Sequence, residues 1–560
     1  MLPVSRRTLG SMVLALAGAS ALPASTRAQP STRLYVGHAA RLTAEIPGDW
    51  NVGQTRVGAI YAFDCQGAEG FVVSLPLGGP TLNEATAEVA GSFPFLGHES
   101  TDVTTRWSGQ RGRRIDGGSG DTKASALIVP HPYPFDLYGE RKAYAALISD
   151  VDHFEMISAT LSFSPDRVTP DAYVTSVLEL VEARAYWSSG VDWDAAREQA
   201  RLDLEGLTDV NLAQGAIANI IGHLTGAGDN HSRVRSPEQL SVQGETTGVG
   251  LLIGDRRVLV VYQDGPADRA GVRAGDLIEA VDDRPFFPTL NVSEPSALWG
   301  LTVRLALRRA GVAEPITVTV EQGPYAQFCP PTGHRLAGDL GYIEVLQFNT
   351  PGMEADYVAT ARSVSESVDE SPTHGWVIDL RLNLGGSYSP MVAGVGPILG
   401  NGIFLGWRWP DNRQSWVTYA DSRILDGGQE VAEYADQGSG LLKRANPPVA
   451  VLTGPLTASS GEVATLAFVG RPETRRFGET TAGLTTGNVG NPLFDGSMLV
   501  LAEVAMTDRT GMTHLEGIEP DESVPIDWES YGTDDDPVLQ AAVAWLDQQP
   551  VTGDATPAGG

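Results

Sequence analysis

The sequence predicts a multidomain protein of the α/β and α+β classes, with a mixed α/β core in its C-terminal half. The chain has 560 residues, too many for one hydrophobic core, because a domain usually holds about 100–200 residues. Its composition, 42% hydrophobic and 19% charged, is that of folded protein rather than of a disordered chain. Strand and helix patterns alternate over residues 334–530, whereas the three segments before them differ in pattern.

The charge balance limits the possible partners. Lys and Arg number 39 against 69 Asp and Glu, so the net charge is −30. Because nucleic acid is bound by clustered cations, we expect no nucleic-acid partner. The two cysteines, Cys65 and Cys329, exclude a disulfide scaffold, but whether they pair with each other stays open. No His or carboxylate pair occurs at metal-ligand spacing, and we expect no metal and no other cofactor.

The first 28 residues have the features of an export signal. Residues 5–9 read Ser-Arg-Arg-Thr-Leu, an apolar stretch follows at 12–22, and the small residue Ala28 ends the segment. We therefore expect export by the twin-arginine route to the periplasm or the cell exterior. This run is too short to span a bilayer, and no later apolar run reaches about 18 residues, so an integral membrane protein is not expected.

Residues 32–165 form the first predicted domain, of unknown role. Alternating stretches separated by Gly, Pro and Asp turns favour an antiparallel sheet with one or two helices, an α+β domain. Residues 168–245 are predicted to be helical, because apolar residues recur at helical spacing. The three helical runs are 170–184, 192–207 and 210–224.

Residues 246–325 resemble a PDZ domain. They begin with the turn Gly248-Val249-Gly250-Leu251 and contain Gly-Pro-Ala-Asp-Arg-Ala-Gly-Val at 265–272. Such a turn exposes backbone N–H groups that can hold a carboxylate, and the strand after it offers an edge to a peptide strand. Gly248, Val249, Gly250 and Leu251 are the candidate peptide-binding residues, and a spacer without binding is the alternative.

Residues 334–530 are predicted to form the mixed α/β core, in which strands of one sheet carry packed helices. After it, residues 531–560 are expected to hold an amphipathic helix at 536–548 and a disordered tail from Gly553. The expected strands of the core are 341–348, 375–381, 448–454, 477–480 and 497–507, and its expected helices are 355–368 and 459–469.

Three short segments could carry chemistry. Ser459 lies between a buried strand and a helix, where the helix N-terminus stabilises negative charge, although a capping serine is the common alternative. Gly385 and Gly386 follow another strand and can expose N–H groups as an oxyanion hole, or form a flexible loop. His231 lies in Asp-Asn-His-Ser, residues 229–232, where a solvated histidine would also be ordinary.

Together these segments resemble the carboxyl-terminal processing (tail-specific) protease family of serine peptidases, including its tricorn-like branch. The motifs that carry the resemblance follow one another in the family's order: 229–232, 379–386, 457–462, 478–483 and 517–521. The resemblance covers about residues 168–530 and leaves 32–165 outside. It implies a serine peptidase core at 334–530 and an exported endopeptidase that acts on unfolded or loosely folded polypeptides, in part through their C-termini. The alternative is an inactive relative that binds peptides or hydrophobic ligands.

The resemblance also implies which residues act. Many members use a lysine base directly after the Gly-Glu-x-Thr-x-Gly motif, but Leu484 stands there, and no lysine lies in 478–520. The tricorn-like branch instead uses a histidine and a glutamate, which implies Ser459 as nucleophile, His231 as base and Glu516 as the residue that orients the imidazole.

The oxyanion hole would then consist of the Ser460 N–H and that of Gly385 or Gly386. Asn230 and His514 stand where the branch often has a relay serine and an acidic residue, so whether either takes part stays open. Because the chain is acidic, we expect the pKa of the histidine base to be raised, with activity rising between about pH 6 and 8.

Overall fold

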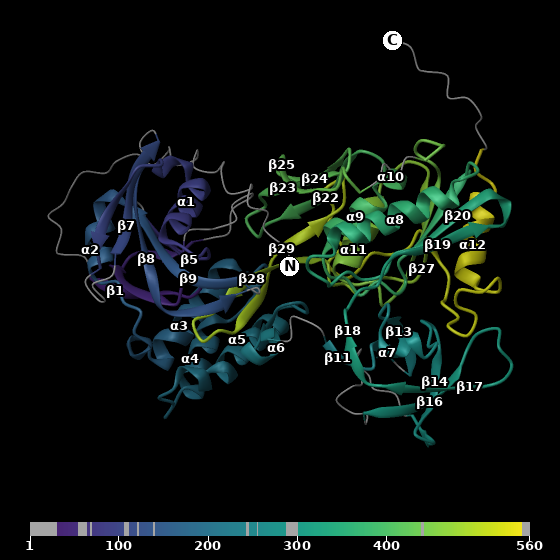
Figure 1. Cartoon of the computed structure of the whole chain (residues 1–560), viewed down its shortest axis with the longest axis horizontal. Helices are drawn as coiled ribbons and strands as arrows, with labels where there is room; N and C mark the ends of the chain where they lie inside the picture. The colour runs from purple at the N-terminus through teal and green to yellow at the C-terminus, as the bar shows by residue number, and fades with distance from the viewer. Residues whose placement is uncertain are drawn as a thin grey trace, which may run out of the picture.

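The computed structural model describes residues 31–53, 64–67, 70–105, 111–119, 122–137, 140–241, 246–254, 256–286, 301–437 and 442–550. The expected export signal at 1–28 and the expected disordered tail from Gly553 lie outside these residues. Within them, no helix has the length and apolar character needed to cross a membrane. Figure 1 shows an elongated molecule, with its earliest strands at one end and the C-terminal helix at the other.

The N-terminal unit, formed by β1–β9 with α1 and α2, has the antiparallel sheet and two helices that the sequence predicts. β1 (Thr32–Gly37) pairs with β2 (Leu42–Pro47), and the larger sheet has the order β3-β4-β5-β9-β8-β7-β6. Side chains alternate between the two faces of a strand, so α1 and α2 cover opposite faces of this sheet. The elements are β3 (Asn51–Val52), β4 (Cys65–Gln66), β5 (Phe71–Leu77), α1 (Leu82–Ser92), β6 (Ser100–Thr104), β7 (Arg111–Ser119), β8 (Thr122–Leu137), β9 (Glu140–Asp150) and α2 (Val151–Ala159).

The helical segment contains α3 (Pro170–Arg184), α4 (Trp193–Asp203) and α5 (Gln214–Gly226). Thr169 caps α3 and Pro170 occupies its first turn, as helix starts favour. The last two helices are shorter than the predicted runs, because α4 ends at Asp203 and a separate 3-10 turn, Val210–Leu212, precedes α5.

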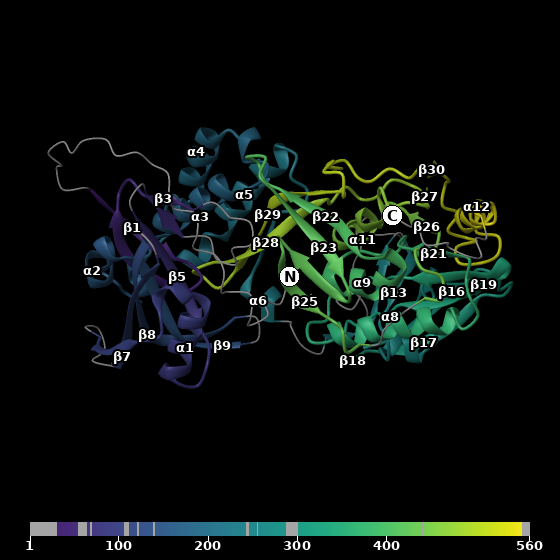
Figure 2. The same ribbon diagram turned by 90° about the horizontal axis from the view of Figure 1, so that it is seen from above.

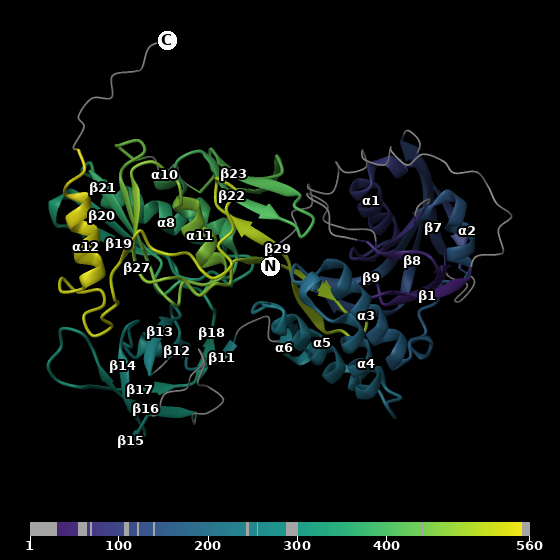
Figure 3. The same cartoon turned by 180° about the vertical axis from the view of Figure 1, so that it is seen from behind.

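The PDZ-like segment forms a six-stranded sheet in which β12 (Leu251–Gly254) is an edge strand among the described residues. α7 (Pro266–Arg269) is a single short turn, and β11 (Thr246–Gly248) pairs with β18 (Gly323–Tyr325). The remaining strands are β13 (Arg257–Val261), β14 (Leu277–Val281), β15 (Arg284–Pro285), β16 (Thr302–Arg308) and β17 (Ile316–Glu321). Figures 1 and 3 show this sheet beside the C-terminal core, below α12 (Pro537–Leu546).

The core is a six-stranded sheet of order β19-β20-β21-β26-β27-β30, parallel except for its first strand. Trp376, Ile378 and Val451 face α8, α9 and α11, whereas Val377 and Leu452 face α12. The elements are β19 (Thr332–Leu336), β20 (Leu340–Glu344), α8 (Glu354–Val368), β21 (Gly375–Asp379), α9 (Tyr388–Gly394), β26 (Val449–Thr453), α11 (Ser460–Phe468), β27 (Thr474–Gly478) and β30 (Glu522–Ser523).

A second sheet joins the helical segment to the core. β10 (Arg233–Arg235) pairs with β29 (Met498–Thr507), although more than 260 residues separate them in sequence. β28 (Thr486–Pro492) and β29 form a long hairpin, which Figures 1 and 2 show between the N-terminal unit and the core. The segments 168–245 and 334–530, separate in the sequence analysis, therefore share one sheet. Its other strands are β22 (Gly402–Arg408), β23 (Gln414–Ala420), β24 (Arg423–Asp426) and β25 (Gln429–Glu433).

The two cysteines do not pair. Cys65 and Cys329 are free and buried, and they belong to different hydrophobic clusters. Burial raises the pKa of Cys65 to about 12, and it also raises the pKa of Cys329. Both are therefore thiols rather than reactive thiolates at neutral pH.

Candidate active site

Ser459 occupies a strained turn between the parallel sheet and a helix. β26 ends at Thr453 and α11 begins at Ser460, so Ser459 is the last residue before the helix. Its φ is 55° and its ψ −116°, a conformation that a non-glycine residue adopts only at a cost of about 1–3 kcal/mol. Backbone strain of this kind is typical of functional sites. The side chain is half-buried and lies at the positive end of the helix dipole.

Hydrogen bonds from neighbouring loops hold this turn in place. Thr457 donates its hydroxyl to the Leu380 carbonyl at 2.9 Å, and the Ala458 N–H donates to the Asn383 carbonyl at 2.9 Å. Both acceptors belong to the segment that follows β21. The nucleophile turn and the glycine loop are thus built as one unit, which explains why their motifs occur together.

Glu462 supports the same turn from below. Its fully buried carboxylate accepts the Ser459 N–H at 2.9 Å, the Thr481 hydroxyl at 2.5 Å and the Gly483 N–H at 2.8 Å. Burial raises the pKa of Glu462, although the donors favour its ionised form. The carboxylate therefore connects the nucleophile to the loop that precedes β28.

Gly385 and Gly386 lie against the nucleophile in conformations that suit glycine. Their φ angles are 102° and 113°. A Cβ at position 385 would lie 2.9 Å from the Ser459 Cβ and 3.1 Å from the Ser460 N, and a Cβ at 386 would lie 1.9 Å from the Phe348 carbonyl oxygen. The chain approaches Ser459 this closely only because both residues lack side chains.

The N–H groups beside Ser459 differ in availability. The Gly385 N–H donates to the Asn383 Oδ1 at 3.0 Å. Within the described ranges, the N–H groups of Gly386 and Ser460 have no hydrogen-bond partner. Of the candidate oxyanion donors, these two are available to a substrate.

A buried ion-pair network anchors the strand that leads to the glycine loop. Arg381 pairs with Asp379 at 2.6 Å and with Asp536 at 2.7 Å, and all three side chains are fully buried. The guanidinium also lies 4.4 Å from the ring centre of Tyr531. The network ties the glycine loop to the segment before α12, which contains Asp536. Breaking it would be costly, because the loss of one partner leaves a buried charge unpaired.

His231 lies in a loop that is attached to the hairpin. Asp229 accepts the N–H groups of His231 at 2.8 Å and Ser232 at 2.9 Å. The Ser232 hydroxyl in turn accepts the N–H of Ala502, in β29, at 2.8 Å. Asn230 donates to the Gly483 carbonyl at 3.4 Å. The histidine loop and Glu462 thus contact the same residue, Gly483, which brings the loop to the nucleophile turn.

The imidazole of His231 is buried and bound by a hydroxyl. Its Nδ1 lies 2.9 Å from the Thr486 Oγ1, and the residue is 7% exposed. Burial, together with the charge of Arg233, lowers the pKa of His231 to about 4, against an opposite effect of Asp229. The raised pKa expected from the acidic composition is therefore wrong, because local desolvation outweighs distant charges. No hydrogen bond joins His231 to Ser459 in the described part of the chain.

The other candidate residues lie as follows. Glu516 is exposed and its side chain forms no hydrogen bond or ion pair with the described residues, although its backbone passes close to Gly483. His514 contacts Asp508 at 3.0 Å rather than His231. Leu484, at the place of the family's lysine, is half-buried.

Thr486 is the residue that sequence reasoning missed. It follows the Gly-Glu-x-Thr-x-Gly motif by three positions, and it is separated from His231 by 255 positions. A hydroxyl residue at the start of a strand is too common to attract attention. Only the pairing of β28 with β29, and of β29 with β10, shows that it lies beside the histidine.

The candidate peptide-binding turn lies at an edge of the PDZ-like sheet. Gly248 ends β11, Gly250 has a φ of 76°, and Leu251 begins β12. The side chains of Val249 and Leu251 are buried in the core of this sheet, so the backbone is what the turn presents.

The PDZ-like sheet packs directly on the catalytic loops. Leu252 and Tyr262 from this sheet share a hydrophobic cluster with Leu382, Leu384 and Leu456. The last three flank the glycine loop and the nucleophile turn. The candidate peptide-binding segment and the candidate active site therefore share one hydrophobic cluster.

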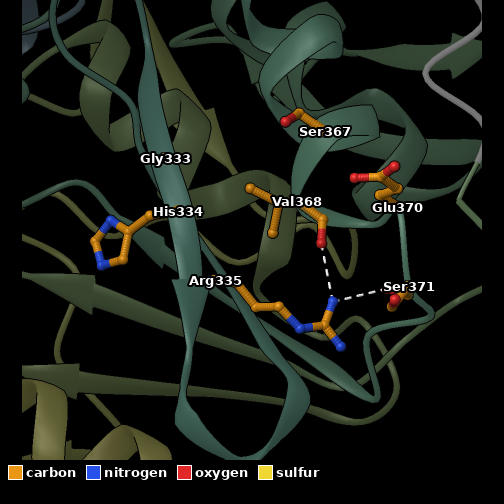
Figure 4. A pocket seen from close by; sticks show the side chains of 7 residues that line it. All are labelled: Gly333, His334, Arg335, Ser367, Val368, Glu370 and Ser371. Carbon is orange, nitrogen blue, oxygen red and sulfur yellow. Dashed lines mark hydrogen bonds between the residues drawn. The ribbon is translucent and has the colours of Figure 1, made fainter.

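A cavity of about 230 Å³ lies elsewhere, at the C-terminal end of α8 (Figure 4). Arg335 points into it and donates to the carbonyls of Val368 at 2.9 Å and Ser371 at 2.7 Å. Val368 is the last residue of α8, so the arginine caps the helix there and also holds the loop that follows at Ser371. None of the lining residues belongs to the catalytic segments, and we assign no chemistry to this cavity. They are Gly333, His334, Arg335, Ser367, Val368, Glu370 and Ser371.

A strained serine at a helix start, glycine N–H groups beside it and a nearby buried histidine define a site of the serine-hydrolase class. Comparison with known families identifies the domains. Residues 339–524 match the model described as peptidase family S41, and residues 257–294 match that of the PDZ domain. The chain thus contains an S41 peptidase domain preceded by a PDZ domain.

Similar proteins include the nisin-resistance protein of Lactococcus lactis subsp. lactis, 33% identical over 27% of this chain and 46% of that protein. The carboxy-terminal-processing protease of Bartonella bacilliformis is 27% identical over 38% of this chain and 51% of that protein. The chain spans about half the length of these curated relatives. A solved structure titled photosystem II D1 C-terminal processing protease shares 22% identity over 67% of this chain and 97% of that one, with a TM-score of 0.44.

Proposed function

We propose that this chain is an exported serine endopeptidase that cleaves unfolded or loosely folded polypeptides. The observation that carries the proposal is the Ser459 turn. A positive φ at a non-glycine residue, directly before a helix and against two glycines, lies inside the segment that matches the S41 family. An ordinary capping serine would need neither the strain nor the glycines.

The chemistry proceeds through an acyl-enzyme. The Ser459 Oγ attacks the peptide carbonyl carbon while His231 takes the hydroxyl proton. The negative oxygen of the tetrahedral intermediate accepts hydrogen bonds from the N–H groups of Ser460 and Gly386. His231 then gives its proton to the leaving amine, and the C–N bond breaks. Water attacks the ester in the same way, releasing the new carboxyl group and restoring Ser459.

The contact with Thr486 decides which ring nitrogen of His231 is left for catalysis. Thr486 occupies the Nδ1 of His231, so Nε2 is the nitrogen that faces Ser459 in the substrate complex. A histidine base would be that of the tricorn-like branch, in which Glu516 would act through a second group rather than by direct contact. Catalytic hydrogen bonds are often long in free enzymes and tighten when substrate binds.

The alternative is an inactive relative that binds peptides or hydrophobic ligands. It is favoured by one observation, the absence of a hydrogen bond between Ser459 and His231 among the described residues. The two functions make opposite predictions for covalent labelling, because only an activated serine attacks a fluorophosphonate.

Replacing Ser459 with alanine tests the proposal. Ser459→Ala should abolish both casein cleavage and fluorophosphonate labelling, whereas loss of a helix cap alone would cost about 0.5–2 kcal/mol of stability and leave turnover intact. Ser371→Ala, in the cavity of Figure 4, is the matched control and should behave as the wild type. If the wild type is not labelled at all, the chain is a binding protein and not a peptidase.

The substrate's C-terminus is the proposed PDZ ligand. Gly248–Leu251 presents backbone groups next to the edge strand β12, where a peptide can add a strand. Peptides with a free, apolar C-terminal residue should bind more tightly than their amidated forms in calorimetric titrations. Equal affinities for the acid and the amide would exclude a carboxylate site at this turn.

The cellular location is also part of the proposal. The twin arginines at positions 6 and 7, with the apolar stretch after them, support export to the periplasm or the exterior. Replacing both arginines with lysine should keep the protein inside the cell, as fractionation would show.

A further inference from the structure

The β28–β29 hairpin holds the catalytic histidine at one end. Thr486, the first residue of β28, contacts the imidazole at 2.9 Å. Ala502, in β29, donates its N–H to Ser232 at 2.8 Å and accepts the N–H of Tyr186, just after α3, at 2.8 Å. A shift of this hairpin would therefore move the base.

The other end of the hairpin packs away from the peptidase core. Leu493, Leu499 and Leu501 lie in one hydrophobic cluster with α3, α5 and Val36 of β1. At the tip, a Cβ built on Gly496 would lie 2.9 Å from a guanidinium nitrogen of Arg41. Both Val36 and Arg41 belong to the N-terminal unit, which lies outside the family match.

Arg184 connects the N-terminal unit to the hairpin by hydrogen bonds. Its Nε donates to the Gly53 carbonyl at 2.9 Å, and its Nη1 donates to the Asn491 Oδ1 at 3.1 Å. Asn491 lies in β28 and also donates to Glu503, in β29, at 3.1 Å. One guanidinium thus joins the N-terminal unit to both strands.

The residue that Arg184 contacts and the residue that contacts His231 lie close together in the same strand. Asn491 and Thr486 lie five positions apart in the same strand, or about 17 Å along it at roughly 3.4 Å per residue. The strand is paired with β29 from Thr486 to Pro492, with one register shift between Gly487 and Asn488, so a displacement at Asn491 is carried toward Thr486 by a strand that is held along its length. A misplacement of about 1 Å at a reacting group can cost about 100-fold in rate.

We propose that the N-terminal unit is a positioning element of the peptidase site, which acts through Arg184 and the β28–β29 hairpin on His231. This inference rests on the proposed function. It gives residues 32–165 a role that does not require a ligand or a second active site. Arg184 and Thr486 are positioning residues, since both act through His231.

Kinetics of full-length variants test the inference. Arg184→Gln removes both guanidinium contacts, whereas Asn491→Ala keeps the contact with Gly53 and removes the one to the hairpin together with the Asn491–Glu503 hydrogen bond. Each should lower kcat on a peptide substrate by about 10-fold or more with KM changed less than about two-fold, because the base is displaced while substrate binding is kept. Arg33→Gln is the control. It breaks the 2.6 Å ion pair with Glu179, which joins the N-terminal unit to α3 without touching the hairpin.

A double-mutant cycle separates positioning from general destabilisation. Thr486→Val should lower kcat, and Arg184→Gln should add much less in that background than it does alone, since both act on the same imidazole. If the double variant loses kcat by the product of the two single losses, the inference is overturned. A wild-type kcat in both Arg184→Gln and Asn491→Ala would overturn it as well. Thermal melts accompany each variant, and if Arg184→Gln does not fold, a folded and fully active Asn491→Ala overturns the inference by itself. A wild type that neither cleaves nor labels would reject the proposed function instead, and the inference with it.

Discussion

The side chain of His231 combines burial with a single hydroxyl partner. Its pKa of about 4 results from desolvation and from Arg233, which together outweigh the carboxylate of Asp229. A histidine base must be neutral to accept a proton, and a pKa of about 4 keeps the proposed base His231 neutral through the whole physiological range. Burial disfavours the imidazolium, whereas the nearby carboxylate of Asp229 acts in the opposite direction.

The pH profile should show this low pKa. In the free enzyme, kcat/KM rises as the base loses its proton, so the acidic limb should lie near pH 4 rather than between 6 and 8. His231→Gln, which keeps the size of the side chain but not its basicity, should remove most turnover at every pH. The measurement is kcat/KM from pH 3.5 to 8 with a charge-free peptide. A limb at or above pH 6.5 would show that His231 is exposed in the working enzyme.

Lys443→Ala is the control for the alternative base. Lys443 donates to the Glu370 carbonyl at the end of α8, away from the catalytic segments, so its removal should leave kcat nearly unchanged. Activity that depends on Lys443 and not on His231 would reject the histidine mechanism.

Sequence reasoning located the residues whose environment is local and missed the one defined by long-range pairing. The Ser459 turn and the Gly385–Gly386 loop follow buried strands of one parallel sheet, so their neighbourhood follows from the order of the elements. Thr486 meets His231 only through antiparallel pairing across 255 positions, for which no residue pattern exists. The acidic composition also gave a wrong prediction for the pKa of His231, since the burial of a side chain cannot be obtained from the net charge.

At the scale of elements, the glycine loop combines two constraints. Gly386 has a positive φ, and the Phe348 carbonyl lies where its Cβ would be. The hydrogen bond from the Ser460 hydroxyl to the Gly386 carbonyl, 2.5 Å, fixes the loop against the nucleophile helix. The loop is thus held too tightly to accept even one additional methyl group.

Gly386→Ala should therefore lower kcat by about 100-fold or more, because the loop must move away from Ser459 to relieve the clash. Gly352→Ala is a matched control. Gly352 also has a positive φ, 89°, but a Cβ there would meet no atom within 4 Å. It should cost about 1 kcal/mol of stability and no activity. Equal kcat in the two variants would mean that the Gly386 N–H takes no part in catalysis.

The elements differ in how far the sequence predicts them. Strands of the core such as β21 and β26 are continuous apolar runs, and their burial on both faces makes them easy to recognise. The predicted helix at 192–207 extends beyond the real end at Asp203, because helical periodicity continues into the turn that follows. The pairing of β10 with β29 was not predicted, since three residues carry no usable period.

At the scale of the whole molecule, buried histidines link stability to pH. Burial lowers the pKa values of His38, His131 and His231 to about 4 each. Their unfolded-state values are near 6.5, so below that pH the unfolded chain binds more protons than the folded one. Stability from these groups is complete above pH 6.5 and is lost as the pH falls toward 4.

The free energy of unfolding measured in urea should therefore be lower at pH 5 than at pH 7, by up to about 2 kcal/mol per histidine. Buried carboxylates with raised pKa values, such as Asp64 and Glu344, act in the opposite direction, so a histidine variant is needed to separate the two contributions. His131→Gln should reduce the difference between the two pH values. A stability that is constant from pH 7 to 5 would contradict the assigned burial of these histidines.

The ion pair between Arg381 and Asp536 has a consequence for biosynthesis. A ribosome makes about 5–20 residues per second from the N-terminus, so a chain that has just passed residue 480 already carries the serine turn and the glycine loop. It still lacks Thr486, β29 and Asp536, which complete the site across separations of 255 and 155 positions. An unfinished chain therefore has a nucleophile without a positioned base and a glycine loop without its anchor. If the chain is the proposed peptidase, the order of its residues keeps an unfinished chain from cleaving its unfolded neighbours.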